Sequence, residues 1–277
     1  MILERAMNIL FTLDSNYIHP FKVAMKSMFL NNAGESLTIY LMHSSIKDDE
    51  LADIEAFVRH HGQEFVSIKV SDESFSNAAT TMHYTKEMYY RLICHEFLPN
   101  DMEKILYIDP DTLIINSLKS LYEIDIDGYL FVGAYHETMP TKVLNQIRFH
   151  EYDLTNYYNS GVLLINLNLA RQRINSAEIF KFVEENGGKL ILPDQDVLNA
   201  LFSNDIKSID EKLYNYDARY FHLYRLKFDN EWTMREVIKR TVILHFCGAK
   251  KPWRDDYRGS FSSLYAHYEN LMNSTKY

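Results

Sequence analysis

The first part of the chain alternates between short apolar runs and amphipathic segments, and this alternation allows very few fold classes. Runs rich in β-branched and aromatic residues predict strands, and apolar residues at helical spacing predict helices. Such alternation predicts parallel strands with helices on both faces of the sheet. We expect strands at Ile9–Leu13, Thr38–His43, Val66–Val70 and Lys104–Ile108, and helices at Phe21–Asn31, Lys47–His61 and about Lys86–Phe97.

The second half of the chain has a different sequence pattern, with irregular polar stretches rich in Tyr and Asn. No internal repeat, low-complexity tract or Pro/Gly/Ser linker marks a boundary. We therefore predict that residues 1–277 form a single α/β domain whose two halves share one mixed sheet. The later elements expected are strands at Leu130–Tyr135, Gly161–Asn166 and Val242–Phe246, and helices at Ser176–Asn186, Asp194–Phe202 and Phe261–Met272.

Charge and cysteine content exclude several classes of protein. The net charge of −9, with no basic block in the first 250 residues, argues against nucleic acid as a partner. Cys94 and Cys247 have no CxxC companion, which argues against a disulfide framework or a zinc knuckle and favours a reducing cytosol. The run Ile9–Leu13 is too short for a signal peptide or a membrane span, so we expect a cytoplasmic protein.

Two aspartates follow directly on the strand expected at Lys104–Ile108, in the order Asp109-Pro110-Asp111. In open α/β sheets, ligands bind at the carboxyl ends of the strands. Carboxylates at i and i+2 around a turn can both reach one hard divalent cation, which completes its shell with phosphate oxygens. The alternative interpretation is that the acids only solvate a strand end, because Asp-Pro-Asp is also good turn chemistry.

Two other short motifs suit a bound small molecule, and each also has a structural interpretation. Thr12, Asp14 and Asn16, at the end of the first strand, can hydrogen-bond a base and ribose, with Tyr17 stacking on the base. The alternative is an ordinary turn. Arg91 can form a bidentate fork with a carboxylate or phosphate, and the alternative is a surface arginine.

Polar side chains also open two apolar segments of the second half. Asn159-Ser160-Gly161 precedes the apolar run Val162–Leu167, and Asp194-Gln195-Asp196 begins a helix. An aspartate at a helix start is usually a cap and complements the helix dipole. Asp-Gln-Asp nevertheless places three oxygen-bearing side chains together, which is more than capping requires.

The segment from His245 to Trp253 combines groups that suit a metal and a phosphate. A neutral imidazole at His245 can complete the coordination of a carboxylate-bound metal. Gly248 lets the backbone approach a ligand, and the ammonium of Lys251, three residues later, can neutralise a phosphate. The alternative is a core histidine followed by solvated lysines.

Taken together, six motifs resemble those of the retaining glycosyltransferases of family 8, which include bacterial lipooligosaccharide galactosyltransferases, glycogenin and galactinol synthase. They appear in family order, from Met7 to about Trp253, and look closest to the lipopolysaccharide-type galactosyl- and glucosyltransferases of bacteria. The resemblance implies a single-domain, Rossmann-like GT-A fold, with a nucleotide-binding half at about 7–112 and an acceptor half with the C-terminal helix at about 113–277. The six motifs are Thr12 to Tyr17, Arg91-Leu92, Tyr107 to Asp111, Asn159 to Asn166, Asp194 to Asp196 and His245 to Trp253.

The resemblance also implies ligands and residue roles. The family binds a UDP-sugar with Mn²⁺, and Mg²⁺ is the other candidate cation, so we expect a UDP-hexose donor and a glycan acceptor. By resemblance the metal ligands are Asp109, Asp111 and His245, while Lys251 holds the diphosphate. The hexose is surrounded by Arg91, Asn159, Asp194 and Gln195. The other nucleotide-sugar contacts expected are Thr12, Asp14, Asn16, Tyr17, Pro110 and Gly248.

Two departures from the family concern the acceptor and the membrane. Related galactosyltransferases carry an aspartate where Glu137 aligns, so Glu137 is the predicted acceptor-side residue and the acceptor stays open. The sequence ends at Ser274-Thr275-Lys276-Tyr277, without the basic, aromatic extension by which some relatives dock on membranes. We therefore expect no transmembrane segment and at most peripheral contact with the inner face of the membrane. The oligomeric state stays open.

Two routes to retention, and two other classes of function, stay open at this point. Gln195 would face the anomeric carbon, but an amide oxygen is a poor nucleophile, so we favour same-face attack in which the leaving phosphate oxygen takes the acceptor proton. In a double displacement Asp194 is the candidate nucleophile. A metal-dependent UDP-sugar phosphohydrolase would release product at the same rate with or without acceptor. A non-catalytic UDP-sugar-binding module would show no turnover.

Overall fold

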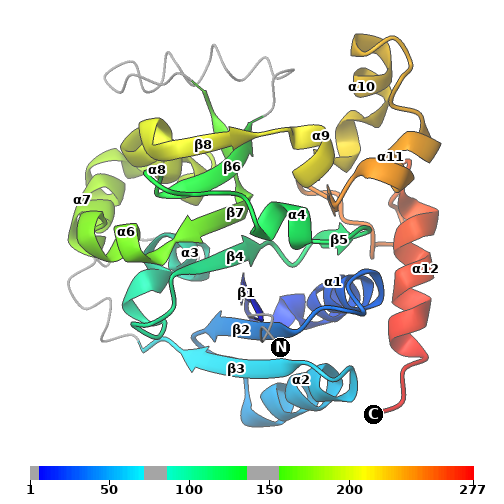
Figure 1. The fold of residues 1–277 in the computed structure, drawn as a ribbon, viewed down its shortest axis with the longest axis horizontal. Coiled ribbons are helices and arrows are strands. Elements are labelled where there is room, and N and C mark those ends of the chain that lie inside the picture. The colour runs from blue at the N-terminus through cyan, green and yellow to red at the C-terminus, as the bar shows by residue number, and fades with distance from the viewer. Residues whose placement is uncertain (1–5, 72–85, 136–155) are drawn as a thin grey trace.

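The structure, a computed structural model, describes residues 6–71, 86–135 and 156–277. Its centre is a seven-stranded sheet with the strand order β3-β2-β1-β4-β7-β6-β8 (Figure 1). The strands are β1 (Met7–Thr12), β2 (Leu37–His43), β3 (Glu64–Lys69), β4 (Lys104–Ile108), β6 (Phe131–Tyr135), β7 (Tyr158–Asn166) and β8 (Ile206–Ile209).

The strand directions make this sheet mixed. β1, β2, β3 and β4 run parallel to one another, as the alternation in the sequence predicts. β7 is antiparallel to both of its neighbours, β4 and β6, whereas β6 and β8 are parallel. The carboxyl ends of β1 and β4 therefore lie side by side at one edge of the sheet, which is where open α/β sheets bind ligands.

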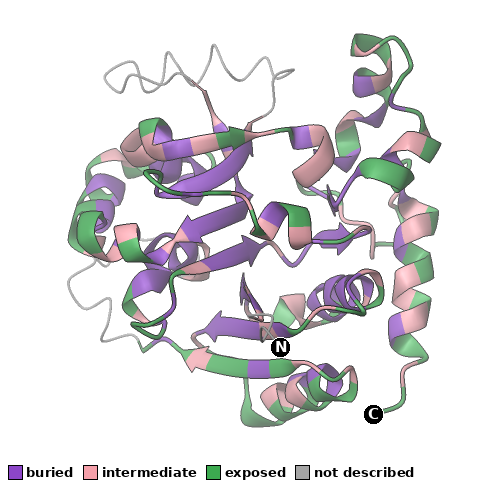
Figure 2. Ribbon diagram, in the orientation of Figure 1, coloured by how far each residue is buried: buried purple, intermediate pink, exposed green. Residues whose placement is uncertain are grey.

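Helices cover both faces of the sheet, and a separate apolar core fills each side (Figure 2). The alternation of side chains along β1 shows why: Ile9 and Phe11 belong to one core, and Leu10 belongs to the other. The first core includes residues of α1 (Ile18–Asn31), α2 (Asp48–His60) and α12 (Ser262–Asn273). The second includes residues of α3 (Tyr90–Ile93), α6 (Leu167–Arg173), α7 (Ser176–Asn186) and α8 (Pro193–Phe202). The predicted mixed α/β fold is confirmed.

The helix expected over Lys86–Phe97 is divided into short turns of different pitch. A 3₁₀ turn at Lys86–Tyr89 leads into α3, and a second 3₁₀ turn follows at Cys94–Glu96. Tyr89 and Tyr90, where the first 3₁₀ turn meets α3, are both fully buried.

The expectation of one shared sheet is wrong, because the strand predicted at Val242–Phe246 joins a second sheet. This sheet has three short strands in the order β5-β10-β9: β5 (Thr112–Ile114), β10 (Ile243–His245) and β9 (Tyr216–Asp217). β10 is antiparallel to β5, and His245 pairs with Thr112. The second sheet therefore brings His245 next to the aspartates that end β4. The division of the domain near residue 112 stays a prediction.

Short helices surround the second sheet and complete the fold (Figure 1). Their sequences carry no long apolar periodicity, and they were not predicted. They are α4 (Lys119–Tyr122), α9 (Glu211–Tyr214), α10 (Phe221–Lys227) and α11 (Met234–Arg240).

Candidate functional site

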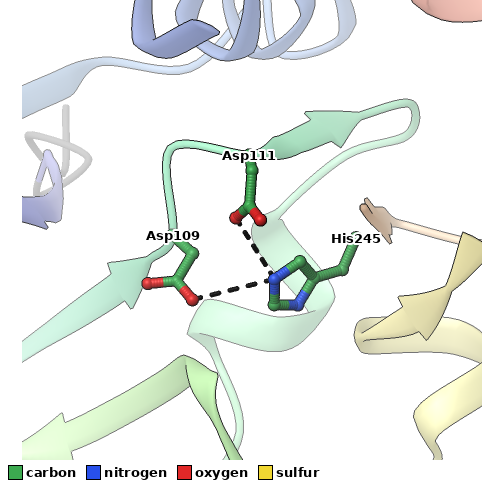
Figure 3. Close-up of side chains that lie close together, drawn as sticks. All are labelled: Asp109, Asp111 and His245. Carbon is green, nitrogen blue, oxygen red and sulfur yellow. Dashed lines mark ion pairs between the residues drawn. The ribbon is translucent and has the colours of Figure 1, made fainter. Parts of the chain in front are cut away.

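The two aspartates after β4 sit on a turn that the neighbouring chain holds in place. The N–H of Asp109 donates to the carbonyl of Gly161 at 2.8 Å, which extends the β4–β7 ladder past the strand end. The hydroxyl of Thr112 donates to the carbonyl of Asp109 at 2.9 Å and closes the turn. The turn interpretation of Asp-Pro-Asp is therefore correct, and it does not exclude a ligand, because the carboxylates of Asp109 and Asp111 point to the same side (Figure 3).

His245 completes this cluster from the end of β10. Its Nε2 atom lies 3.2 Å from Oδ1 of Asp111 and 3.7 Å from Oδ2 of Asp109 (Figure 3). One possible ligand atom from each of the three residues lies within 4.8 Å of the others. His245 and Asp111 are buried, whereas the side chain of Asp109 is 20% exposed toward the cavity.

The donor set fits a divalent cation. Two carboxylates suit hard cations such as Mn²⁺ and Mg²⁺, and the imidazole favours a transition metal such as Mn²⁺ over Mg²⁺. Gly161 leaves room between the donors: a Cβ atom there would lie 2.4 Å from Oδ2 of Asp109 and 2.4 Å from Cε1 of His245. A side chain at position 161 would clash with the donors, which explains the glycine in Asn159-Ser160-Gly161.

Positively charged groups beside the cluster offset the negative charge of its carboxylates. Lys251 forms an ion pair with Asp111 and also donates to the carbonyl of Phe246 at 3.1 Å. Burial alone raises the pKa of Asp111, but the charges of His245 and Lys251 outweigh burial and hold this pKa well below its usual value. Burial lowers the pKa of His245, whereas Cys247 and Asp111 raise it by more, to well above its usual value. A cation would therefore compete with a proton on His245.

Arg91 is buried and binds several groups at once. Its Nη1 atom lies 3.0 Å from Oδ1 of Asp109 and 3.1 Å from Oδ2 of Asp194, and it donates to the carbonyl of Ser160 at 3.1 Å. The guanidinium also lies over the ring of Tyr107, 4.4 Å from its centre. The interpretation of Arg91 as a surface residue is wrong. Burial lowers the pKa of Arg91, but the two carboxylates raise it by more, so the guanidinium stays charged.

The Asn159 and Asp194-Gln195 motifs meet beside Arg91. Oδ2 of Asp194 accepts a hydrogen bond from the Ser160 hydroxyl at 2.7 Å. Oε1 of Gln195 accepts from Nδ2 of Asn159 at 3.1 Å and from the N–H of Ser160 at 3.4 Å. Asp196 has a different role, because its carboxylate accepts from the N–H groups of Ile191 and Leu192 and holds the loop before α8.

At the end of β1, the structure supports both interpretations of the polar motif. Asp14 caps the 3₁₀ turn Ser15–Tyr17 by accepting from the N–H of Asn16 at 2.9 Å. Thr12 lies in hydrogen-bond contact with the hydroxyl of Tyr107 at 3.3 Å, and that hydroxyl donates to Asp109. Tyr17 packs edge-on against Trp253, with 6.0 Å between ring centres. The motif is therefore a turn that also faces the site.

Two adjoining cavities contain these side chains. The larger, of about 760 Å³, is lined among others by Asn16, Tyr17, Arg91, Asp109, Asp111, Asn159, Asp194, Gln195, His245, Gly248 and Lys251. The smaller, of about 210 Å³, lies at the end of β1 and is lined among others by Thr12, Asp14, Tyr17, Arg91, Asp109, Pro110 and Asp111. Glu137, the predicted acceptor-side residue, lies outside the described residues. Every other residue to which the resemblance assigns a site role lines one of the two cavities.

Sequence reasoning missed some residues of the site. The Tyr107 hydroxyl contacts the site because Tyr107 and Asp109 are two positions apart and share one side of the extended chain, a signal that the period of a strand could have supplied. Arg219, whose guanidinium pairs with the buried Asp217, also lines the larger cavity. Asn215 bonds to His245 from an irregular stretch, and no motif marks it.

Within residues 6–71, 86–135 and 156–277, none of the helices combines the length and the apolar character that a bilayer span needs.

Comparisons with known proteins agree on one family and one fold. The sequence model of Glycosyl transferase family 8 matches residues 8–257. General stress protein A from Bacillus subtilis is 25% identical over 282 residues, which cover 99% of this chain and 96% of that protein. Lipopolysaccharide 1,2-glucosyltransferase from Escherichia coli is 22% identical, covering 90% of this chain and 73% of that protein. A crystal structure of the galactosyltransferase LgtC with donor and acceptor sugar analogs superposes with a TM-score of 0.81 at 22% identity, covering 98% of each chain.

Proposed function

Because the chain belongs to glycosyl transferase family 8 and has the GT-A fold, we propose that it moves a hexose, either galactose or glucose, from a UDP-sugar to a saccharide or glycan acceptor with retention of configuration. One observation carries the proposal: the Asp109, Asp111 and His245 cluster lines the same 760 Å³ cavity as the buried pair of Arg91 and Asp194. The cavity therefore places side chains that suit a diphosphate next to side chains that suit a hexose.

The two cavities divide the proposed donor between them. The smaller cavity takes the base and ribose, where Thr12 and Asp14 offer hydrogen bonds. Tyr17 lines both cavities, a position from which its ring can stack on the base. The larger cavity takes the diphosphate and the hexose, with Arg91 and Asp194 binding hexose hydroxyls. A carboxylate and a guanidinium discriminate between epimers because the wrong epimer leaves these buried groups unpaired.

Asp109, Asp111 and His245 would hold the cation, which we propose is Mn²⁺. When bound, it supplies Lewis-acid stabilisation of the charge on the departing diphosphate. Lys251, which pairs with Asp111, adds a second positive charge at the same place, and its partial burial strengthens the effect of that charge. Tyr107 and Arg91 hold Asp109 in position through its Oδ1 atom.

We favour same-face attack for the transfer itself. The bond between the anomeric carbon and the diphosphate oxygen breaks, and the acceptor oxygen bonds to the same face of that carbon while its proton passes to the leaving oxygen. Two contacts support this route over a double displacement. Oε1 of Gln195 already accepts two N–H groups. Oδ2 of Asp194 is neutralised by Arg91 and hydrogen-bonded by Ser160, so its nucleophilicity is low.

For the acceptor we propose a saccharide of the lipopolysaccharide type, reached from the cytoplasmic side of the membrane. Similarity to a lipopolysaccharide glucosyltransferase supports this class. Glu137 is the proposed acceptor-side residue. Glu137→Gln should then reduce transfer but spare acceptor-independent hydrolysis of the donor, whereas Asp194→Asn should reduce both. Equal losses of hydrolysis and transfer in Glu137→Gln would assign it to the donor side or to the structure.

A screen of UDP-sugars tests the proposed function. Slow hydrolysis in the presence of Mn²⁺ identifies the donor before the acceptor is known, and adding acceptor saccharides should then divert the hexose from water to the acceptor. Product release at the same rate with and without any acceptor would indicate a phosphohydrolase. Mn²⁺-dependent UDP binding with no turnover for any acceptor would indicate a binding module. Membership of a glycosyltransferase family disfavours both.

A further inference from the structure

A buried asparagine connects the candidate metal ligand His245 to the sugar side of the cavity. Asn215 directly follows α9 and is fully buried. Its Oδ1 atom lies 2.9 Å from Nδ1 of His245, and its Nδ2 group donates to Oδ1 of Asn159 at 2.9 Å. Asn159 in turn donates through Nδ2 to Oε1 of Gln195 at 3.1 Å. A continuous series of hydrogen bonds therefore joins His245, Asn215, Asn159 and Gln195, which we call the amide relay.

One backbone group sets the direction of the whole relay. The N–H of Gly161 lies 2.9 Å from Asn159, and because it can only donate, the atom it meets must be the oxygen Oδ1. Asn215 faces that same oxygen and must present its Nδ2 donor to it. The other atom of the Asn215 amide, which faces His245, is then its oxygen. An amide oxygen can only accept, so Nδ1 of His245 must carry a hydrogen.

This direction decides which nitrogen of His245 is available to a cation. With the hydrogen held on Nδ1, the lone pair of the neutral ring lies on Nε2, the atom that faces both Asp109 and Asp111. Metal-binding histidines generally donate their other N–H to an oxygen acceptor, which fixes the ring and its tautomer. Oδ1 of Asn215 is such an acceptor, and it lies within hydrogen-bond distance of Nδ1 of His245.

We infer that Asn215 is a positioning residue that fixes His245 with Nε2 toward the cation, and that the amide relay couples this ligand to the orientation of Gln195. The inference rests on the proposed function for its cation. Its distinctive consequence is that the two amide atoms of Asn215 have separate effects: the oxygen controls metal affinity, and the NH₂ group controls the sugar side of the cavity.

Two variants of Asn215 separate these effects. Asn215→Leu removes both atoms at similar volume, and we expect Mn²⁺ affinity to fall by about 10–100-fold, the usual effect of losing such a partner of a metal-bound histidine. Asn215→Asp keeps an oxygen for Nδ1 but places a second oxygen against Oδ1 of Asn159. We expect it to retain Mn²⁺ affinity within about threefold of wild type, while transfer falls about 10-fold or more because Asn159 and Gln195 are no longer held.

The measurements are Mn²⁺ titration followed by electron paramagnetic resonance, and ¹⁵N NMR of histidine-labelled protein without added metal. In the spectra, a His245→Asn variant assigns the His245 signals. Because the pKa of His245 is raised well above its usual value, the spectra are recorded at a pH at which the ring is neutral. There, Nδ1 of His245 should be the protonated nitrogen in wild type and in Asn215→Asp, and a population protonated on Nε2 alone should appear in Asn215→Leu. Asn32→Leu is the matched control, because Asn32 is also buried and its side-chain amide bonds to backbone atoms of Met28 and Leu118. It should leave Mn²⁺ affinity unchanged.

The possible outcomes distinguish an error in the role of Asn215 from an error in the proposed function. Wild-type protein that binds no Mn²⁺ would remove the proposed cation, and the NMR spectra would still test the relay. If wild type binds Mn²⁺ and folded Asn215→Leu binds it equally well, Asn215 does not position His245. Should Asn215→Leu fail to fold, Asn215→Asp decides alone: a loss of Mn²⁺ affinity as large as 10-fold, or unimpaired transfer, would overturn the assignment.

Discussion

Arg91 and Asp194 form a buried ion pair across the cavity, with 3.1 Å between Nη1 and Oδ2. The same nitrogen lies 3.0 Å from Asp109, so one guanidinium holds a candidate metal ligand and a candidate hexose-binding residue in a fixed relation. The pair comes from α3 and α8, which share the second apolar core. Packing on that side of the sheet therefore determines the geometry of the site.

Arg91→Lys should test this relation. A lysine keeps the positive charge but lacks the planar fork that reaches several acceptors at once. Because small misplacements of positioning groups are costly, we expect kcat/KM for transfer to fall about 100-fold. The measurement is steady-state kinetics with the best UDP-hexose. Arg171→Lys is the control, because Arg171 bonds to the carbonyls of Met102 and Pro99, and it should keep kcat/KM within about twofold. Comparable losses in the two variants would mean that the Arg91 effect is only structural.

Chelation should abolish UDP binding or weaken it severely, and added Mn²⁺ should restore it. Asp111→Asn should behave like the chelated enzyme, since an amide supplies no charge to offset the charge of the cation. Calorimetric titration with UDP checks both statements. The exposed Asp127→Asn is the matched control and should bind UDP with Mn²⁺ as wild type does. Metal-independent turnover by Asp111→Asn would refute the assignment of Asp111 as a ligand of a required cation.

The adjacent lysines should differ sharply in their effect on turnover. Lys251 reaches Asp111 and the cavity, whereas Lys250 is exposed to solvent. Lys251→Ala should lower kcat and raise KM, with a total loss of about 10²–10³, because the charge of the diphosphate grows as the bond to the sugar breaks. Lys250→Ala should be nearly silent. If Lys250→Ala is the more damaging change, Lys251 does not hold the diphosphate.

Gly161→Ala should weaken metal binding while the protein stays folded. The added methyl group would lie 2.4 Å from atoms of both Asp109 and His245, so these side chains must move apart to accommodate it. We expect Mn²⁺ affinity to fall at least about 10-fold, as when metal ligands lose their support. Mn²⁺ titration and thermal unfolding measure the two properties. Gly187→Ala, where an added Cβ meets no atom within 4 Å, is the control. Unchanged Mn²⁺ affinity in Gly161→Ala would show that the cation does not bind between these residues.

Local sequence patterns predicted the central sheet well. A short continuous apolar run identifies β1, which is buried on both faces: Ile9 and Phe11 face one core and Leu10 the other. An apolar run that ends in acids identifies β4 and places Asp109 and Asp111 at a ligand-binding edge. These predictions succeed because the apolar run and the turn residues that mark each strand lie within a few residues of one another, although the strands themselves pair with distant segments, as β1 does with β4.

Most of the second sheet could not be predicted in this way: the strand expected at Val242–Phe246 corresponds to β10, but β5, β9 and the sheet itself were not expected. β5, β9 and β10 are two or three residues long, too short to show a period, and they are stabilised by partners far away in the chain. The pairing of His245 with Thr112 puts the third candidate ligand beside Asp111. Sequence motifs predicted that these residues belong to one site, but the pairing that joins them is a tertiary contact.

Asn215 shows the same limit most clearly. The sequence by itself determined the chemical types available to the site: carboxylates after β4, an imidazole at the end of β10, and amides at Asn159 and Gln195. Only the tertiary structure decided that a lone asparagine after α9 meets both His245 and Asn159. The physical reason is that a hydrogen bond depends on distance and direction in space, and the spacing of residues along an irregular stretch specifies neither.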